Sequence, residues 1–339
     1  MTDLPTDHGK PTPQAEPRGP NLSRPFPPRS PRQTLSYLRG LLEAHGLRPK
    51  NKLGQSFLID LNFLDFMVRQ AELSRADLVI EVGSGTGSLT AKLAEQAGHV
   101  LSVEIDPGFF ALAQENTEPF DNVTLLLADI LEKKSRLNPE VLQHVQRLWQ
   151  TGHWQRLKLV SNLPFVVATP VIVNFLLTDL PLQLLLITIQ WELAARLEAS
   201  PGTKDYSAVS VIVQALADVQ VLRRMPPQLF WPRPKVDSAL VKIVPRPDKK
   251  AAIPDLPWFH RLVRDIYLHR RKNLRSALEP LYKGQLTREQ LDELLRQHGF
   301  DPHGRAEALS VAEHIRLSTI LPRYEHPSAE SQDGNIVSD

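Results

Sequence analysis

The sequence predicts an α/β protein in which a mostly parallel sheet is followed by a small all-α domain. Two observations support this fold class. Between residues 78 and 189, apolar strand-like runs alternate with helix-like segments, which is typical of βαβ units around a parallel sheet. From residue 258 to residue 320 the pattern is largely helical. The length of 339 residues also fits about two domains, at roughly 150 residues per domain.

Each element follows from its local pattern. The expected strands are the apolar runs Leu78–Val82, Val100–Ile105, Val123–Leu127, Leu157–Val160 and Leu184–Ile189. The expected helices between them are Ser88–Ala97, Pro107–Glu115, Pro139–Trp149 and Pro170–Leu177. Two further runs, Val209–Val221 and Ser238–Val244, flank a proline-rich loop at residues 226–234. We expect these two runs to be strands that pair antiparallel at one edge of the sheet.

The composition divides the chain into four parts. Nine of the 29 prolines lie in residues 1–31, so residues 1–32 are predicted to be a disordered tail. Residues 33–250 form the expected sheet domain, and residues 251–324 form the helical domain, which opens with a linker at Ala251–Pro257. Its expected helices are Trp258–Ala277, Arg288–Gln297 and Val311–Ile320, and Thr287 with Gln290 resembles a capping box. The polar residues 325–339 are predicted to be a second disordered tail.

Several classes of protein are excluded by composition. The chain has no cysteine, which rules out disulfides, thiolate zinc sites and a cysteine nucleophile. None of the 11 histidines forms an H-x-x-x-H pair on a helix, so no metal site is expected. There is no run of 18 apolar residues and no secretory signal pattern. We therefore expect a cytoplasmic protein without a membrane partner.

A glycine-rich turn follows the first expected strand. Gly83 and Gly85 lie in the segment Glu81-Val82-Gly83-Ser84-Gly85-Thr86-Gly87, and such turns let the backbone approach a ligand closely. The spacing differs from the G-x-G-x-x-G of dinucleotide folds, and no lysine follows, which excludes a P-loop. A tight turn without a ligand is the alternative interpretation.

Acidic residues end the next two strands. Glu104, followed by Ile105, ends the second strand, where a carboxylate can accept hydrogen bonds from ribose hydroxyls. Asp129, followed by Ile130, ends the third strand, where it can accept from an adenine amino group. Each acid alone is more often a helix cap or a solvated side chain. Together with the glycine turn they indicate an adenosine cofactor without a pyrophosphate, which S-adenosylmethionine fits better than NAD.

The fourth strand ends in Asn162-Leu163-Pro164-Phe165. This turn resembles the Asn-x-Pro-aromatic turn of amino-group methyltransferases. A purine amine is a poor nucleophile because its lone pair is delocalised into the ring. The Asn162 side-chain oxygen and the Leu163 carbonyl would accept its two N–H bonds and return electron density to the nitrogen. Pro164 fixes the turn, and Phe165 offers a face on which a flipped-out base can stack. An ordinary strand-terminating turn is the alternative.

Longer strings then identify a family. The strings Leu53–Leu58, Phe230–Ser238, Arg270–Arg275 and Arg305–Ser310 resemble those of the ribosomal RNA adenine dimethyltransferases, and most closely the kasugamycin-resistance branch, which acts on the small subunit. The resemblance runs from about Asn51 to about Arg316. It implies a Rossmann-like class I S-adenosylmethionine-dependent methyltransferase sheet. The cofactor residues that it implies are Ser56, Leu58, Gly83, Gly85, Glu104, Ile105, Asp129, Ile130 and Asn162.

A basic cluster in the helical part is the expected RNA contact. Arg270, Arg271, Lys272 and Arg275 are expected to lie mostly on one helical face, and the resemblance implies that they contact RNA phosphates. Alone, the cluster would more often be a solvated helix face.

The implied function is N6,N6-dimethylation of two adjacent adenosines near the 3′ end of 16S rRNA, within an immature 30S subunit and by a monomer. The alternatives are a 23S rRNA adenine methyltransferase of the macrolide-resistance type, a non-catalytic assembly or nucleic-acid-binding factor, and, less favoured, a DNA adenine methyltransferase. Three residues depart from the family pattern: Ser56 replaces Asn, Phe165 replaces Tyr and Trp191 replaces Lys.

Overall fold

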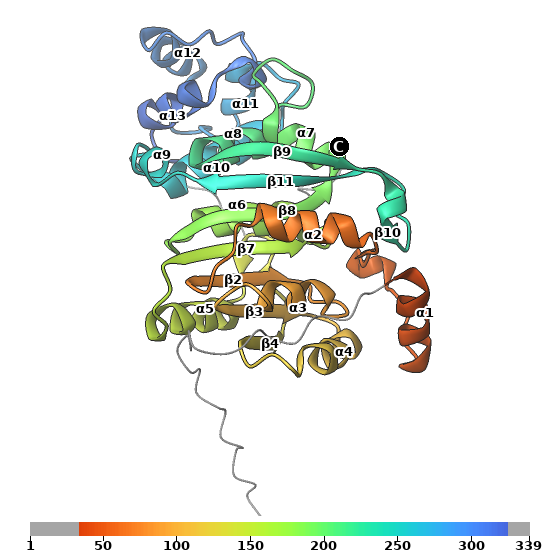
Figure 1. Cartoon of the computed structure of the whole chain (residues 1–339). Coiled ribbons are helices and arrows are strands. Elements are labelled where there is room, and N and C mark those ends of the chain that lie inside the picture. Colours follow the sequence, from red (N-terminus) through yellow and green to blue (C-terminus); the bar gives the residue numbers. More distant parts are fainter. Residues whose placement is uncertain (1–33, 325–339) are drawn as a thin grey trace, which may run out of the picture.

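The computed structural model describes residues 34–324, and the two predicted tails, residues 1–32 and 325–339, lie outside the described residues. The centre of the molecule is a seven-stranded sheet with the strand order β4-β3-β2-β7-β8-β11-β9 (Figure 1). Its strands are β2 (Asp77–Val82), β3 (His99–Glu104), β4 (Val123–Leu127), β7 (Arg156–Asn162), β8 (Leu182–Gln190), β9 (Ala217–Met225) and β11 (Ser238–Pro245). The α/β prediction is confirmed, and the five runs predicted as parallel strands are all strands.

The direction of the strands decides where a ligand can bind. Strands β2, β3, β4, β7 and β8 are parallel, whereas β11 is antiparallel to both of its neighbours. The predicted antiparallel pairing at the sheet edge is therefore confirmed. Two short ribbons complete the β structure, β1 (Phe57–Leu58) with β10 (Phe230–Trp231), and β5 (Leu131–Lys133) with β6 (Arg136–Leu137).

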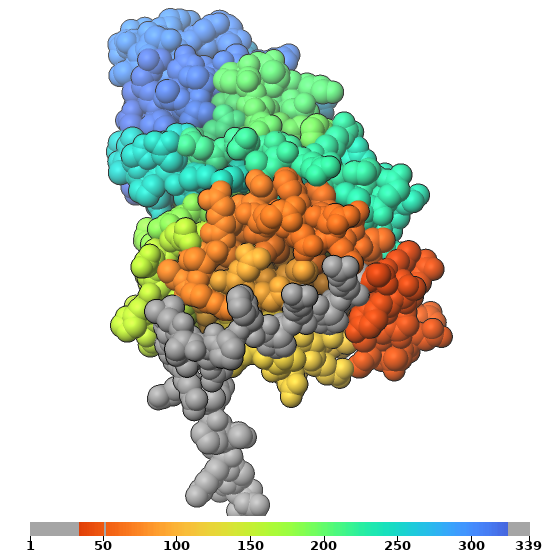
Figure 2. Space-filling view, in the orientation of Figure 1, coloured from red at the N-terminus to blue at the C-terminus, as the bar shows by residue number. Residues whose placement is uncertain are grey.

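Helices cover both faces of the sheet. Those of the first part are α1 (Leu35–Ala44), α2 (Leu61–Gln70), α3 (Ser88–Ala94), α4 (Pro107–Thr117), α5 (Pro139–Thr151), α6 (Ala168–Leu177), α7 (Trp191–Glu198), α8 (Ala208–Leu216) and α9 (Pro247–Ala251). Buried side chains of α2 and α3 pack on one face of the sheet, and those of α5, α6 and α8 pack on the other. In Figure 2, α1 and the segment that carries α2 form a continuous surface on the side that faces the viewer.

The helical part contains α10 (Leu256–Tyr267), α11 (Leu274–Leu278), α12 (Arg288–Gln297) and α13 (Val311–Ile320). These helices share a core of their own, while Phe259 and Val263 of α10 belong to the core of the sheet. The predicted capping box at Thr287 and Gln290 is present. In the part of the chain that the structure covers, no helix is long and apolar enough to cross a membrane.

Two predicted elements are wrong. The run Val209–Val221 is not one strand, because residues Ala208–Leu216 form α8 and the strand β9 begins only at Ala217. The β-branched residues of α8 are buried in the main core, and Ser207 with Ser210 forms a capping box at its start. Tertiary burial and capping therefore outweigh the strand propensity of this run.

The helix predicted at Trp258–Ala277 is also interrupted. It ends at Tyr267, residues 268–272 form turns, and a new helix begins at Leu274. Asn273 caps this second helix, since its side chain accepts a hydrogen bond from the Ser276 N–H. Asparagine is a favoured residue at a helix start, which explains the break.

Candidate active site

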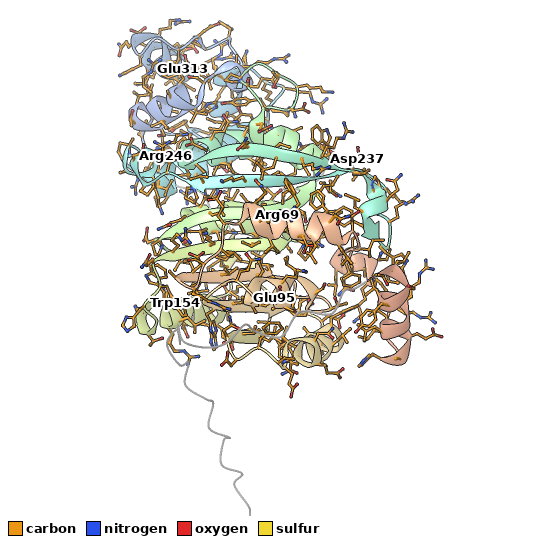
Figure 3. The ribbon with its side chains drawn as sticks, viewed as in Figure 1. Arg69, Glu95, Trp154, Asp237, Arg246 and Glu313 are labelled. Atoms are coloured by element: carbon orange, nitrogen blue, oxygen red, sulfur yellow. The ribbon has the colours of Figure 1, made fainter. Side chains whose placement is uncertain are left out.

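A crevice with a volume of about 200 Å³ opens at the carboxyl ends of the parallel strands. It lies where the strand order reverses between β2 and β7, which is the usual ligand position in an open α/β sheet. In Figure 3 the labelled residue Asp237 lies near this end of the sheet, and the labelled residues Trp154 and Arg246 lie at the opposite end. All twelve residues predicted for the cofactor and the reaction line this one crevice.

The glycine turn forms the floor of the crevice. Gly83 and Gly85 have φ angles of +84° and +53°, a backbone region that favours glycine. A Cβ atom at Gly83 would lie 3.1 Å from the Pro164 ring, and one at Gly85 would lie 2.9 Å from the ring of Phe57. The turn is therefore a glycine cradle: it packs closely against these two rings, and it lines the crevice with its backbone.

Glu104 is fixed at the end of β3 by main-chain donors. Its two carboxylate oxygens accept hydrogen bonds from the Gly85 N–H at 2.8 Å and from the Asp106 N–H at 2.9 Å. The side chain is only 4% exposed, and this burial raises the pKa of Glu104. Each oxygen keeps a further lone pair, so the group suits the two hydroxyls of a ribose.

Glu81 lies below the glycine turn. The hydroxyls of Thr90 and Ser102 both donate to its Oε2 atom at 2.6 Å. Burial raises the pKa of Glu81 to about 7, although these two hydrogen bonds lower it and the nearby charge of Glu104 adds a smaller increase. The Glu81 carboxyl group at the base of the crevice therefore changes its charge near neutral pH.

The adenine end of the predicted cofactor site is more open. Asp129 is exposed, and its Oδ1 atom accepts from the Leu131 N–H at 2.9 Å. Ile105 and Ile130 both line the crevice; Ile105 is 45% exposed, whereas Ile130 is buried. Asp106, by contrast, is a helix cap, since it accepts from Gly108 at the start of α4 and pairs with Lys50 at 2.6 Å. These acidic and apolar residues fit an adenosine that carries a cationic sulfur.

Asn162 is held by two neighbours at the end of β7. Its Nδ2 atom donates to the Ser56 carbonyl at 2.8 Å, and its Oδ1 atom accepts from the Thr188 hydroxyl. Leu163 is buried, whereas Pro164 and Phe165 are half-buried and line the crevice. The turn thus places an amide and an aromatic ring beside the glycine cradle.

The segment at residues 53–58 closes one side of the crevice. Ser56 donates its hydroxyl to the Pro232 carbonyl at 2.9 Å, and Phe57 and Leu58 pair with β10. Ser56 and Leu58 therefore face the cofactor crevice from a strand ribbon that ties this segment to the loop after β9. The Ser56 hydroxyl is occupied within the protein, in keeping with the departure from Asn at this position.

The basic cluster is not one helical face, because Arg270, Arg271 and Lys272 lie in the turn between α10 and α11. Arg271 and Lys272 are exposed. Arg270 donates to the Lys204 carbonyl at 3.0 Å, and Arg275 donates to Asp292 at 2.8 Å with its side chain only 17% exposed. Arg271 and Lys272 are therefore accessible to a ligand, whereas Arg270 and Arg275 make hydrogen bonds within the protein.

Sequence reasoning did not identify Thr188 or Lys50. Thr188 is fully buried in β8 and lies opposite Asn162 in the sheet register. A polar residue within the apolar run Leu184–Ile189 was the available signal for it. Lys50 gave no such signal, because its partner Asp106 lies 56 positions away in the sequence.

Comparisons with known proteins identify the family of the chain. The family model for ribosomal RNA adenine dimethylase matches residues 46–321. A ribosomal RNA small subunit methyltransferase A from Pediococcus pentosaceus is 39% identical over 280 residues, which cover 82% of this chain and 92% of that protein.

Two solved structures share the fold. A dimethyladenosine transferase from Plasmodium falciparum has a TM-score of 0.61 at 21% identity and covers 76% of this chain and 94% of that one. The 23S rRNA methyltransferase ErmE has a TM-score of 0.54 at 23% identity and covers 78% and 99%. The predicted cofactor class and methyltransferase fold are confirmed. The chain therefore belongs to the ribosomal RNA adenine dimethylase family of S-adenosylmethionine-dependent methyltransferases.

Proposed function

We propose that the protein dimethylates N6 of two adjacent adenosines near the 3′ end of 16S rRNA, using S-adenosylmethionine. The proposed substrate is an immature 30S subunit in the cytoplasm, and the active form is a monomer. The observation that carries the proposal is the position of Asn162–Phe165 beside the glycine cradle, in one crevice with Glu104 and Asp129. The small-subunit methyltransferase A relative covers most of the chain and supports the choice of 16S rRNA.

Different residues of the crevice would hold different parts of the cofactor. Glu104 and Asp129 would hold the adenosine of the cofactor, and the Gly83–Gly85 turn would hold its amino-acid end. When bound, the cofactor supplies a methyl group on a sulfonium, which is already activated for transfer. The protein therefore has to position the acceptor, and correct positioning is worth a large part of the barrier.

The turn at Asn162–Phe165 would bind the acceptor amine. In this proposal the Asn162 Oδ1 atom and the Leu163 carbonyl accept the two N–H bonds of a flipped-out adenine. Phe165 stacks on the base, which contributes roughly 1–3 kcal/mol and offsets part of the cost of unstacking. Arg271 and Lys272 are the members of the basic cluster best placed to contact RNA phosphates, because they are exposed.

The test is methyl transfer to ribosomal particles. Purified protein is incubated with methyl-labelled S-adenosylmethionine and 30S particles from a strain that lacks the modification, followed by nucleoside mass spectrometry and position mapping. The expected product is N6,N6-dimethyladenosine at two adjacent positions, and 30S particles that already carry it should take up no label. Label in 23S rRNA would favour the macrolide-resistance alternative, and binding of the particle without any transfer would favour a non-catalytic factor.

A further inference from the structure

We propose that Thr188 is a positioning residue that holds the Asn162 side-chain amide in the one orientation able to accept the target amine. The proposal rests on the proposed function of Asn162. Thr188 does not line the crevice but lies behind Asn162 on the neighbouring strand, at the paired register position. Partners at the same register position of parallel strands point to the same face of the sheet.

The Ser56 carbonyl decides which end of the amide faces which way. This main-chain oxygen can only accept a hydrogen bond, so the Asn162 Nδ2 atom has to face it, at 2.8 Å. The Oδ1 atom then has to face Thr188, whose hydroxyl donates to it. A flipped amide would set two carbonyl oxygens against each other at Ser56, so the two contacts reinforce the same orientation.

The burial of Thr188 makes this contact important. The residue has 0% exposure, so water does not readily replace its hydroxyl if it is removed. The amide oxygen has two lone pairs, of which Thr188 uses one. The other remains for an N–H of the adenine, whereas a rotated amide would present an N–H donor to the amine and repel it.

The decisive variant is Thr188→Val, which keeps the shape of the side chain and removes the hydroxyl. We expect the single-turnover rate of methyl transfer to unmodified 30S particles to fall at least about tenfold at saturating cofactor and particle concentrations. The dissociation constant for S-adenosylhomocysteine should change by less than about threefold. Thr188→Ser should restore the rate to within about threefold of the original protein.

The matched control is Thr124→Val, which removes a strand hydroxyl that bonds His99 at 2.9 Å, away from the crevice. Its rate should equal that of the original protein. A Thr188→Val rate equal to the original would overturn the proposal, and so would a Thr188→Ser variant as slow as Thr188→Val.

A second measurement does not depend on the reaction. The Asn162 side-chain NH2 signals in a ¹⁵N NMR spectrum are assigned by their absence in Asn162→Asp. In Thr188→Val, but not in Thr188→Ser, they should shift and exchange with water at least about threefold faster. Signals that stay the same would overturn the proposal. If the original protein transfers no methyl group to 16S rRNA, the proposed function fails, and these signals still decide whether Thr188 orients the amide.

Discussion

Glu81 illustrates how burial alone changes the chemistry of a residue in this crevice. It is 1% exposed, and its hydrogen-bond donors, Thr90 and Ser102, are neutral hydroxyls. Their hydrogen bonds favour the charged carboxylate, but the loss of hydration outweighs them and raises the pKa to about 7. The carboxyl group therefore titrates within the range in which enzymes are normally assayed.

This pKa predicts a pH-dependent loss of stability that Glu81→Gln removes. The folded protein holds the Glu81 proton more tightly than the unfolded chain, whose pKa is 4.5. Between pH 4.5 and about 7, stability falls as pH rises, by about 3 kcal/mol in total. Urea unfolding of both proteins across this range should show the difference between them changing with pH, then levelling above pH 7. A difference that stays constant would contradict the pKa.

Asn162 is the residue on which transfer depends most. Asn162→Ala should lower the rate of methyl transfer by about 10²–10³-fold, because it removes an acceptor for the target amine. Binding of S-adenosylhomocysteine, measured by calorimetry, should weaken by less than about tenfold. A variant that keeps its full rate would indicate that the amide has no part in the reaction.

For single residues, the sequence indicates which side chains lie in the site better than it indicates the groups that hold those side chains in place. Glu104, Asp129 and Asn162 could be predicted because each ends an apolar strand, where side chains converge on one edge of a parallel sheet. Thr188 and the Ser56 carbonyl could not, because the pairing of β7 with β8 and the path of residues 53–58 are long-range features. No local pattern encodes them.

The elements were predictable where composition and burial agree. The apolar runs of β2, β3, β7 and β8 are mostly buried, so a continuous apolar pattern gives the strand, whereas β4 at the sheet edge is only partly buried. Residues Ala208–Leu216 have the same composition but form a helix, because a helix buried on most sides is apolar throughout. Periodicity cannot separate these two cases over nine residues.

The turn after β2 has little room for an added methyl group. Gly83→Ala introduces a Cβ at φ +84° that lies 3.1 Å from the Pro164 ring. We expect a loss of more than about 1 kcal/mol in stability and at least about tenfold weaker cofactor binding, because the turn has to move away from the crevice.

Gly284→Ala is the matched control for this prediction. Its φ of +87° imposes the same backbone cost, but nothing lies within 4 Å of the new Cβ. It should lose about 1 kcal/mol and keep its cofactor affinity. Equal cofactor affinities in the two variants would contradict the role given to the cradle.

At the scale of the whole molecule, substitutions in the basic turn between α10 and α11 should weaken RNA binding without lowering the stability of the fold. Arg271→Ala with Lys272→Ala should weaken 30S binding and reduce the slope of log affinity against log salt by about two, with little change in melting temperature. The readout is binding to 30S particles across a salt series. An unchanged slope would show that neither side chain contacts a phosphate.

Arg275 should behave in the opposite way. Its ion pair with Asp292 joins α11 to α12 and is mostly buried, so Arg275→Ala leaves this carboxylate with Arg296, at 3.3 Å, as its remaining cationic partner. We expect a loss of about 2 kcal/mol in the free energy of unfolding, typical of one hydrogen bond to a charged group, and an unchanged salt slope. A stable variant with a reduced slope would return Arg275 to the RNA surface. Sequence spacing could not separate these roles, because the predicted helix is interrupted by the turn at residues 268–272.

The most direct test of the whole account is a crystal structure with S-adenosylhomocysteine bound. We expect the ribose hydroxyls to contact Glu104, the adenine to lie beside Asp129, and the sulfur to lie close to the glycine turn and Asn162. A cofactor bound on another face of the molecule, or an empty crevice in crystals grown at a saturating concentration, would contradict it.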